Sequence, residues 1–207
     1  MDRPWFTMTL CAMLGAASAV AVRPICALLL KQRGITAAMP RRHFWVLLGC
    51  LSAAGAIVGW RAGISARGVY LLLLLCAAAC TFYIDAIYRV IPNELVLAVL
   101  GLAAVFGLTG AVKFDIVSSL LGFALCFALF FVPAVLGRKI GAGDVKFAAA
   151  VGFALGFNGS LYAIAAMGAL VLLYVLFLQR VPLAEKWKTM IPMGPFLSLA
   201  LVVVSVL

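Results

Sequence analysis

Charged side chains are scarce in this chain: only 11% of its 207 residues are Asp, Glu, Lys or Arg, whereas soluble domains carry about 25%. Acids are the scarcest, with six Asp and Glu residues against sixteen Lys and Arg. Apolar residues make up 67% of the sequence. This composition excludes an ordinary soluble globular domain and predicts an integral membrane protein.

Paired cysteines are also missing. None of the six cysteines forms a Cys-x-x-Cys pair, so a zinc site of the usual spacing is not expected. Cys76 and Cys80, four residues apart, are interpreted as small packing residues on one helix face. The chain has no internal repeat, low-complexity linker or segment resembling a soluble domain. We expect one transmembrane domain over residues 1–207, without metal or cofactor.

The apolar runs have the length of helices. Because unsatisfied backbone groups exclude open sheets from hydrocarbon, the sequence predicts an all-α, polytopic helical bundle with about eight transmembrane segments. These segments are Trp5–Val22, Phe44–Trp60, Val69–Ile87, Asn93–Gly110, Ile116–Gly137, Val145–Phe157, Leu161–Leu178 and Met193–Leu207.

Three stretches leave alternatives open. The short sixth segment, joined to the seventh by an Asn158-Gly159 turn, crosses the membrane or forms a re-entrant hairpin. After Arg23-Pro24, the apolar piece Ile25–Leu30 is expected to lie in the membrane interface. The first segment resembles a cleavable signal peptide in part, but Asp2 and a proline before the apolar run favour a first membrane helix.

The basic residues predict an orientation. Alternate connections divide the sixteen Lys and Arg residues twelve against four, and the positive-inside rule places the twelve in the cytoplasm and both termini outside. The net charge of +10 is thus explained by topology and by attraction to anionic membrane lipid, with no nucleic-acid partner. The twelve are Arg23, Lys31, Arg33, Arg41, Arg42, Arg89, Arg138, Lys139, Lys146, Arg180, Lys186 and Lys188.

The six acids fall into two groups. Asp2, Asp115 and Glu185 lie at a terminus or beside lysines and are interpreted as solvated charges, and Glu94 lies at a predicted helix start, which favours acids. Asp85 and Asp144 differ, because each lies at one end of an apolar segment and, in this topology, both reach the cytoplasmic end. The two carboxyl groups can therefore meet.

Two adjacent carboxyl groups can catalyse hydrolysis. Because both cannot ionise cheaply at a few ångströms, they share a proton. The ionised group can accept a proton from water while the protonated group donates to an amide, which is general acid–base hydrolysis without a metal. A structural alternative is open: Asp144 caps the sixth segment, and Asp85 pairs with Arg89 one turn on.

The residues around both acids favour breaks in helical structure. Gly141 and Gly143 free the backbone before Asp144 and allow close approach of another helix or an extended substrate. Pro92, seven residues after Asp85, ends one helical turn and starts the next segment.

Three motifs carry a resemblance to a known family. GAGDVK at Gly141–Lys146 resembles the Gly-x-Gly-Asp signature of membrane aspartyl proteases. The stretch from Asp85 to Asn93 resembles the first aspartate motif of the type IV prepilin peptidases, and IPMGPFLSLA, Ile191 to Ala200, resembles that family's closing Ile-Pro-x-Gly-Pro segment. In this order, the motifs make the chain similar to the family from about Leu71 to Leu207.

The resemblance implies a membrane aspartyl endopeptidase of the bacterial inner membrane. Its catalytic pair would be Asp85 and Asp144, and its substrate a type IV prepilin or type II secretion pseudopilin. Such substrates carry a short basic leader, cut at the cytoplasmic face after a glycine and before an apolar helix. The remaining motif residues implied for substrate binding or site structure are Gly141, Gly143, Lys146, Pro92, Asn93, Pro192, Gly194 and Pro195.

One departure from the family limits what the resemblance implies. Many members carry a large cytoplasmic domain with paired Cys-x-x-Cys motifs between the first two helices and also methylate the new N-terminus. The corresponding connection here is short and has no cysteine pair, so peptidase activity is implied and N-methylation stays open. Two other functions also stay open: acids in membrane segments mark proton or solute paths in transporters, and a non-enzymatic assembly scaffold would tolerate Asn at both positions.

Overall fold

The computed structural model describes residues 4–36, 39–137, 140–178 and 192–206. Over these residues the chain forms seven α-helices and one π-helical turn, η1. Their bounds are α1 Pro4–Lys31, α2 Arg41–Ala62, α3 Ala66–Tyr88, α4 Asn93–Leu108, α5 Ile116–Val135, α6 Ala142–Leu173, η1 Tyr174–Leu178 and α8 Gly194–Val206. The all-α bundle is confirmed, but the expected eight segments are wrong: the described residues form seven helices, five of them long and apolar enough to span a membrane, and the expected sixth and seventh segments both lie within α6.

The bundle has the character of a multi-pass membrane protein. Five of its described helices are long and apolar enough to span a membrane, while α4 and α8 are shorter apolar helices. Large apolar side chains such as Leu108 and Phe177 are more than three quarters exposed, which suits a hydrocarbon surrounding. All six cysteines are free.

Helix α1 continues where a break was expected. It runs through Pro24 to Lys31, so Ile25–Leu30 is the last part of this helix and not a separate piece. Its location in the membrane interface stays a prediction. Proline removes one helical hydrogen bond, but in membrane bundles neighbouring helices and local adjustments of the backbone satisfy the group that is left without a partner. Here Cys26 and Leu30 are almost fully buried in the cluster that α1 forms with α2 and α3.

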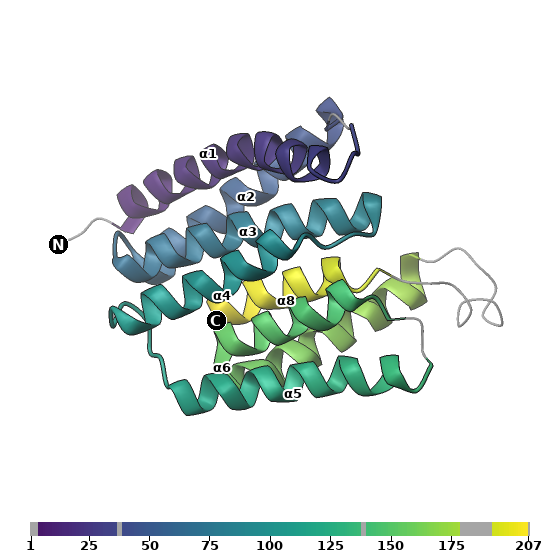
Figure 1. Cartoon of the computed structure of the whole chain (residues 1–207). Coiled ribbons are helices and arrows are strands. Elements are labelled where there is room, and N and C mark those ends of the chain that lie inside the picture. Colours follow the sequence, from purple (N-terminus) through teal and green to yellow (C-terminus); the bar gives the residue numbers. More distant parts are fainter. Residues whose placement is uncertain (1–3, 37–38, 138–139, 179–191, 207) are drawn as a thin grey trace.

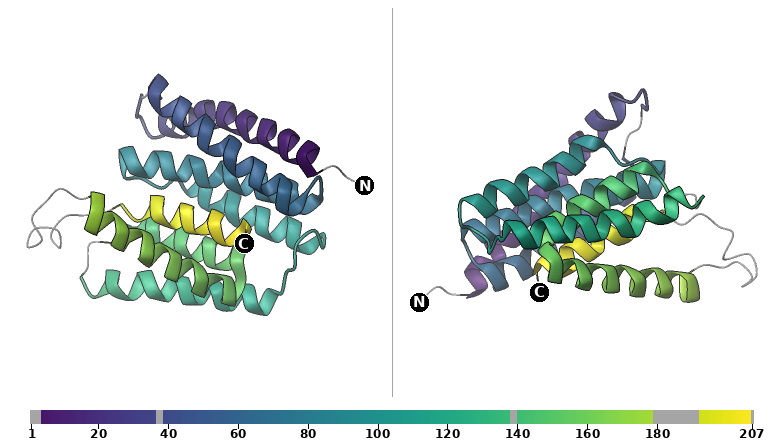
Figure 2. Two further views of the ribbon diagram at one scale, coloured as in Figure 1. Left: turned by 180° about the vertical axis from the view of Figure 1, so that it is seen from behind. Right: turned by 60° about the horizontal axis from the view of Figure 1, so that its bottom comes forward.

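Helix α6 is broken at Gly156, whose φ of 69° and ψ of −177° are not helical. The Ser160 hydroxyl donates to the carbonyls of both Gly156, at 2.6 Å, and Gly152, at 3.2 Å. In a straight helix, residues eight apart are separated by about 12 Å, so the chain must turn back at Gly156. The reversal thus lies two residues before the Asn158-Gly159 turn expected from the sequence, and the second arm runs back along the bundle (Figures 1 and 2).

The helices are stacked in an order that centres on α3. Helices α1 and α2 lie at one edge, α5 and α6 at the other, and α3, α4 and α8 lie between them (Figures 1 and 2). Helix α3 packs against α1, α2, α4 and α8, and α6 packs against α4, α5 and α8. The connections α1–α2 and α3–α4 and the start of α6 share one end of the bundle, opposite the start of α1 and the end of α8 (Figure 1).

Glycines allow α5 and α6 to approach closely. An added Cβ at Gly122 would lie 2.7 Å from the Gly156 carbonyl carbon and oxygen and would also overlap the Gly152 carbonyl oxygen. Real Cβ atoms essentially never approach backbone this closely. The α5–α6 contact therefore requires glycine at this position.

Gly122→Ala is accordingly expected to destabilise the bundle by about 1–3 kcal/mol, the usual cost of overpacking. The free energy of unfolding in detergent measures this. Gly101→Ala in α4 is the matched control, because no atom lies within 4 Å of its added Cβ and alanine is the better helix former. Equal effects of the two substitutions would contradict the close α5–α6 packing.

Candidate active site

Asp85 lies in the last turn of α3, and its residue surface is only 5% exposed. Its Oδ2 accepts a hydrogen bond from the Gly194 backbone N–H at 3.0 Å. Gly194 begins α8, so this N–H is one of the first-turn donors that have no partner within their own helix. The positive end of the α8 dipole therefore faces the Asp85 carboxyl group.

The Gly194 position has no room for a side chain. An added Cβ would lie 2.6 Å from Asp85 Oδ2 and 2.8 Å from its Cγ. Pro195, which follows it, is buried in the first turn of α8, where proline's missing N–H costs little. Pro192 is partly exposed just before the helix, and Ile191 of the same motif lies outside the described residues. Gly194 was predicted as a motif residue for substrate binding or site structure, and the structure places its backbone N–H on Asp85.

Asp144 is the third residue of α6 and is held from the helix start. The Gly141 backbone N–H donates to its carboxyl group, which is half of a capping box. Its Oδ1 is buried and, among the described residues, has no hydrogen-bond partner. Asp144 is therefore not the N-cap residue that the structural alternative expected, since Gly141 holds that position. Its bond to the Gly141 N–H leaves the other, buried carboxyl oxygen available for chemistry.

The structure brings the two aspartates together. Their carboxyl groups are close enough to interact electrostatically. This was expected, because α3 ends and α6 begins at the same end of the bundle (Figure 1). The backbone segments around them also touch, since an added Cβ at Gly143 would lie 3.1 Å from the Ile91 Cβ. Gly143 thus permits the close approach of the α3–α4 connection to the start of α6.

A second contact joins the same two segments. The Lys146 ammonium group donates to Asn93 Oδ1 at 3.3 Å, and Asn93 begins α4 directly after the buried Pro92. Glu94, in the first turn of α4, forms an ion pair with Arg33 at 3.7 Å. These exposed contacts connect the α1–α2 connection, the start of α4 and the start of α6 beside the pair.

Arg89 caps α3 in an unexpected conformation. Its φ of 53° is the only positive value for a non-glycine residue in the described part of the chain, and its N–H donates to the Asp85 carbonyl at 3.0 Å. The side chain also interacts electrostatically with the Asp85 carboxyl group. The expected Asp85–Arg89 ion pair does not form within 4.0 Å among the described residues, and the two side chains interact only at longer range. Nothing in the sequence signals this left-handed arginine.

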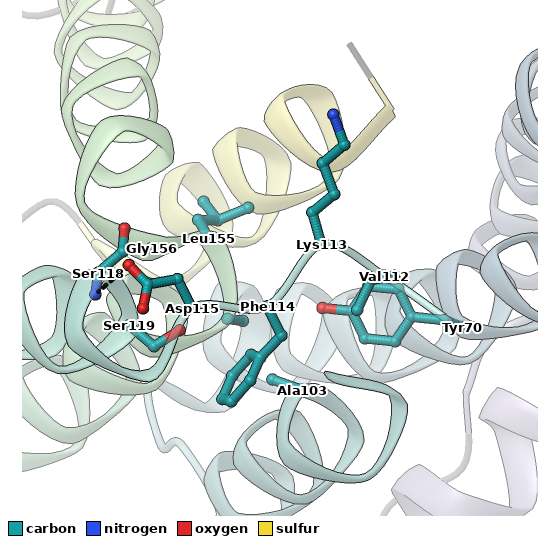
Figure 3. Close-up of a pocket in the computed structure, with 11 residues that line it drawn as sticks. Tyr70, Ala103, Val112, Lys113, Phe114, Asp115, Ser118, Ser119, Leu155 and Gly156 are labelled. Carbon is teal, nitrogen blue, oxygen red and sulfur yellow. Dashed lines mark hydrogen bonds between the residues drawn. The ribbon is translucent and has the colours of Figure 1, made fainter. Parts of the chain in front are cut away.

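A separate hollow of about 440 Å³ lies beside the break in α6. In Figure 3 the Lys113 ammonium group points away from Asp115. The Asp115 carboxylate caps α5 by accepting from the N–H groups of Val117 and Ser118, each at 3.2 Å. Its interpretation as only a solvated charge was incomplete. Neither Asp85 nor Asp144 lines this hollow.

Among the described residues, no three His, Cys, Asp or Glu side chains gather so that they could hold a metal ion. The site offers two carboxyl groups for chemistry, those of Asp85 and Asp144. The Gly194 N–H at the start of α8 orients the Asp85 carboxyl group, and the Gly141 N–H at the start of α6 orients that of Asp144. Such a pair can activate water and protonate a leaving group.

Comparison with known proteins identifies one relationship. A family model described as the type IV leader peptidase family matches residues 70–177, which include both aspartates and the Gly141–Lys146 motif. The curated proteins and the solved structures contain no match to the chain.

Proposed function

The chain belongs to the type IV leader peptidase family, and from this premise we propose that Asp85 and Asp144 cut the leader from a prepilin or a type II secretion pseudopilin. The family is one of aspartic-type prepilin peptidases, and membership implies cleavage of prepilin leaders. The observation that carries the assignment of the pair is that two aspartates, 59 positions apart (144 minus 85), interact at one end of the bundle.

In the proposed reaction, the ionised carboxyl group takes a proton from water as the water oxygen bonds to the scissile carbonyl carbon. The protonated carboxyl group then gives its proton to the leaving nitrogen as the carbon–nitrogen bond breaks. One peptide bond and one water are consumed, a new carboxylic acid and a new amine form, and the two aspartates have exchanged their protonation states. The hydrogen bonds from Gly141 and Gly194 support this scheme because they fix the orientation of both groups.

We further propose that the reaction takes place at the cytoplasmic face of a bacterial inner membrane, within one peptidase domain that includes all described helices. Support comes from the basic residues: Arg33, Arg41 and Arg89 lie in or next to connections at the end of the bundle that holds the aspartates. Positive charge flanks membrane helices on the cytoplasmic side. Anionic lipid would be the surrounding partner.

The purified protein in liposomes is expected to release a leader-sized fragment from a prepilin, read by mass spectrometry. Absence of cleavage for a panel of prepilins and pseudopilins would contradict the proposal. The same spectra test N-methylation, since addition of a methyl donor would add one methyl group to the mature product only if the chain also methylates. Proton or solute flux without peptide product would support a transporter instead.

A further inference from the structure

The hollow of about 440 Å³ beside the break in α6 has several polar groups in its lining. It lies where α4 ends, α5 begins and α6 turns back, at the end of the bundle opposite the aspartate pair (Figure 1). We call it the Tyr70 hollow. Its polar side chains are those of Tyr70, Lys113, Asp115, Ser118 and Ser119, so a phenol, an ammonium group, a carboxylate and two aliphatic hydroxyls surround one space.

Two of these polar groups belong to buried residues and have no hydrogen-bond partner. Tyr70 is 5% exposed and Ser119 is 3% exposed, and neither hydroxyl forms a hydrogen bond with any described residue. Figure 3 shows the Tyr70 hydroxyl pointing into the hollow, toward the side on which Asp115 and Ser119 lie. Buried polar groups are normally paired, because leaving water without a partner is unfavourable. The two hydroxyls are therefore donors in place for a ligand.

The two charged groups of the lining do not neutralise each other. Lys113 and Asp115 lie in the connection between α4 and α5, and no ion pair joins them in the described structure. In Figure 3 the Lys113 ammonium group points away from Asp115. Each oxygen of the Asp115 carboxylate accepts one N–H of α5 and can accept a further bond. The hollow thus presents a positive and a negative group at separate places.

This lining matches a ligand that carries both a phosphate and an ammonium group. Phosphate oxygens can accept hydrogen bonds from the Lys113 ammonium group and from the hydroxyls of Tyr70 and Ser119. An ammonium N–H of the same ligand can donate to Asp115. A ligand with a phosphate alone would face the unmatched negative charge of Asp115, and a quaternary ammonium group would have no N–H to donate to it.

The surroundings of the hollow favour a membrane lipid as the source of these groups. The hollow lies at helix ends, where lipid headgroups surround a bundle whose helices cross the hydrocarbon layer. Large apolar side chains flank the connection that carries Lys113 and Asp115: Leu108 is 81% exposed, Ile116 53% and Val117 60%. Acyl chains can pack against such side chains while the headgroup lies in the hollow, whereas a soluble ligand gains nothing from them.

We propose that the Tyr70 hollow binds the headgroup of a phospholipid that carries a primary ammonium group, of which an ethanolamine phospholipid is the simplest. The bound headgroup would connect α3, through Tyr70, to the α4–α5 connection and to α5, beside the reversal of α6 at Gly156. This inference does not depend on the proposed peptidase function, because the hollow lies at the other end of the bundle and neither aspartate lines it.

Native mass spectrometry of the delipidated protein in detergent tests the choice of lipid. Ethanolamine, choline and glycerol phospholipids with the same acyl chains are added to separate samples. The ethanolamine phospholipid is expected to bind at least about tenfold more tightly than the other two, the usual effect of one hydrogen bond to a charged group. Equal binding of the three lipids, or no binding, would mean that water fills the hollow and would overturn the inference. Displacement of the lipid by an equal concentration of free phosphoethanolamine would overturn the assignment to a lipid.

Two substitutions then locate the bound lipid. Tyr70→Phe removes one hydroxyl and keeps the ring that packs against Phe106 at 5.5 Å between centroids, and it is expected to weaken binding of the ethanolamine phospholipid about tenfold. Tyr162→Phe is its matched control, because Tyr162 is 70% exposed and does not line the hollow. Equal losses for the two variants would contradict the site.

Lys113→Gln keeps the inference testable if Tyr70→Phe does not fold, because Lys113 is an exposed residue outside the helices. It is expected to weaken binding about tenfold, since the phosphate loses its charged partner. Arg67→Gln is the control for charge: Arg67 is also exposed, lies in the first turn of α3 at the same end of the bundle and is absent from the lining. Binding by Lys113→Gln as tight as by wild type would overturn the inference.

Discussion

Asp85→Asn and Asp144→Asn are each expected to reduce prepilin cleavage by about 10²–10⁴-fold, the usual contribution of a positioned general acid or base. Asparagine keeps the size of the side chain but can neither accept a proton from water nor supply one to the leaving nitrogen. For Asp85, an amide oxygen can still accept the bond from the Gly194 N–H, so the fold around α8 is expected to persist. Leader release, followed by mass spectrometry with protein in liposomes, measures the loss.

Asp115→Asn is the matched control for both variants. It makes the same change from carboxyl to amide at the N-cap of α5. Asparagine caps helices as well as aspartate does. Its cleavage rate is expected to equal that of wild type. Retention of cleavage by both single variants at Asp85 and Asp144 would remove the assignment of the pair and favour the scaffold interpretation.

The meeting of the two aspartates could be predicted from the sequence because it depends on simple quantities. Helical segments of membrane length fix which connections share an end of the bundle, and the rarity of acids in an apolar chain makes Asp85 and Asp144 stand out. The three ordered motifs then identified the family, which the match over residues 70–177 confirmed. These signals are local or compositional.

Other features could not be predicted because they depend on distant partners. An Asn-Gly pair at 158–159 is a strong turn signal, yet the chain turns at Gly156, where Ser118 from α5 accepts the Phe157 N–H at 3.0 Å. Proline at 24 signals a break, but burial of the following residues keeps α1 intact. The contact of Gly194 with Asp85 joins residues 109 positions apart.

Gly194→Ala is expected to reduce kcat by about 10²-fold, the cost of misplacing a catalytic group by about 1 Å. The added Cβ would lie 2.6–2.9 Å from three atoms of the Asp85 side chain, so either the carboxyl group rotates or the start of α8 moves away. In both cases the hydrogen bond from the Gly194 N–H weakens. Steady-state kinetics on a prepilin measure the effect, with the loss expected in kcat more than in KM.

Gly168→Ala is the control for this substitution, because it also adds one methyl group to a helical glycine and nothing lies within 4 Å of the new Cβ. It is expected to leave kcat unchanged and to stabilise its helix slightly. A Gly194→Ala protein that folds and cleaves at the wild-type rate would show that α8 does not position Asp85. A selective loss of kcat would instead explain why the tail motif accompanies the two aspartates. Its glycine, Gly194, lets the start of α8 approach the Asp85 carboxyl group closely enough to hold it.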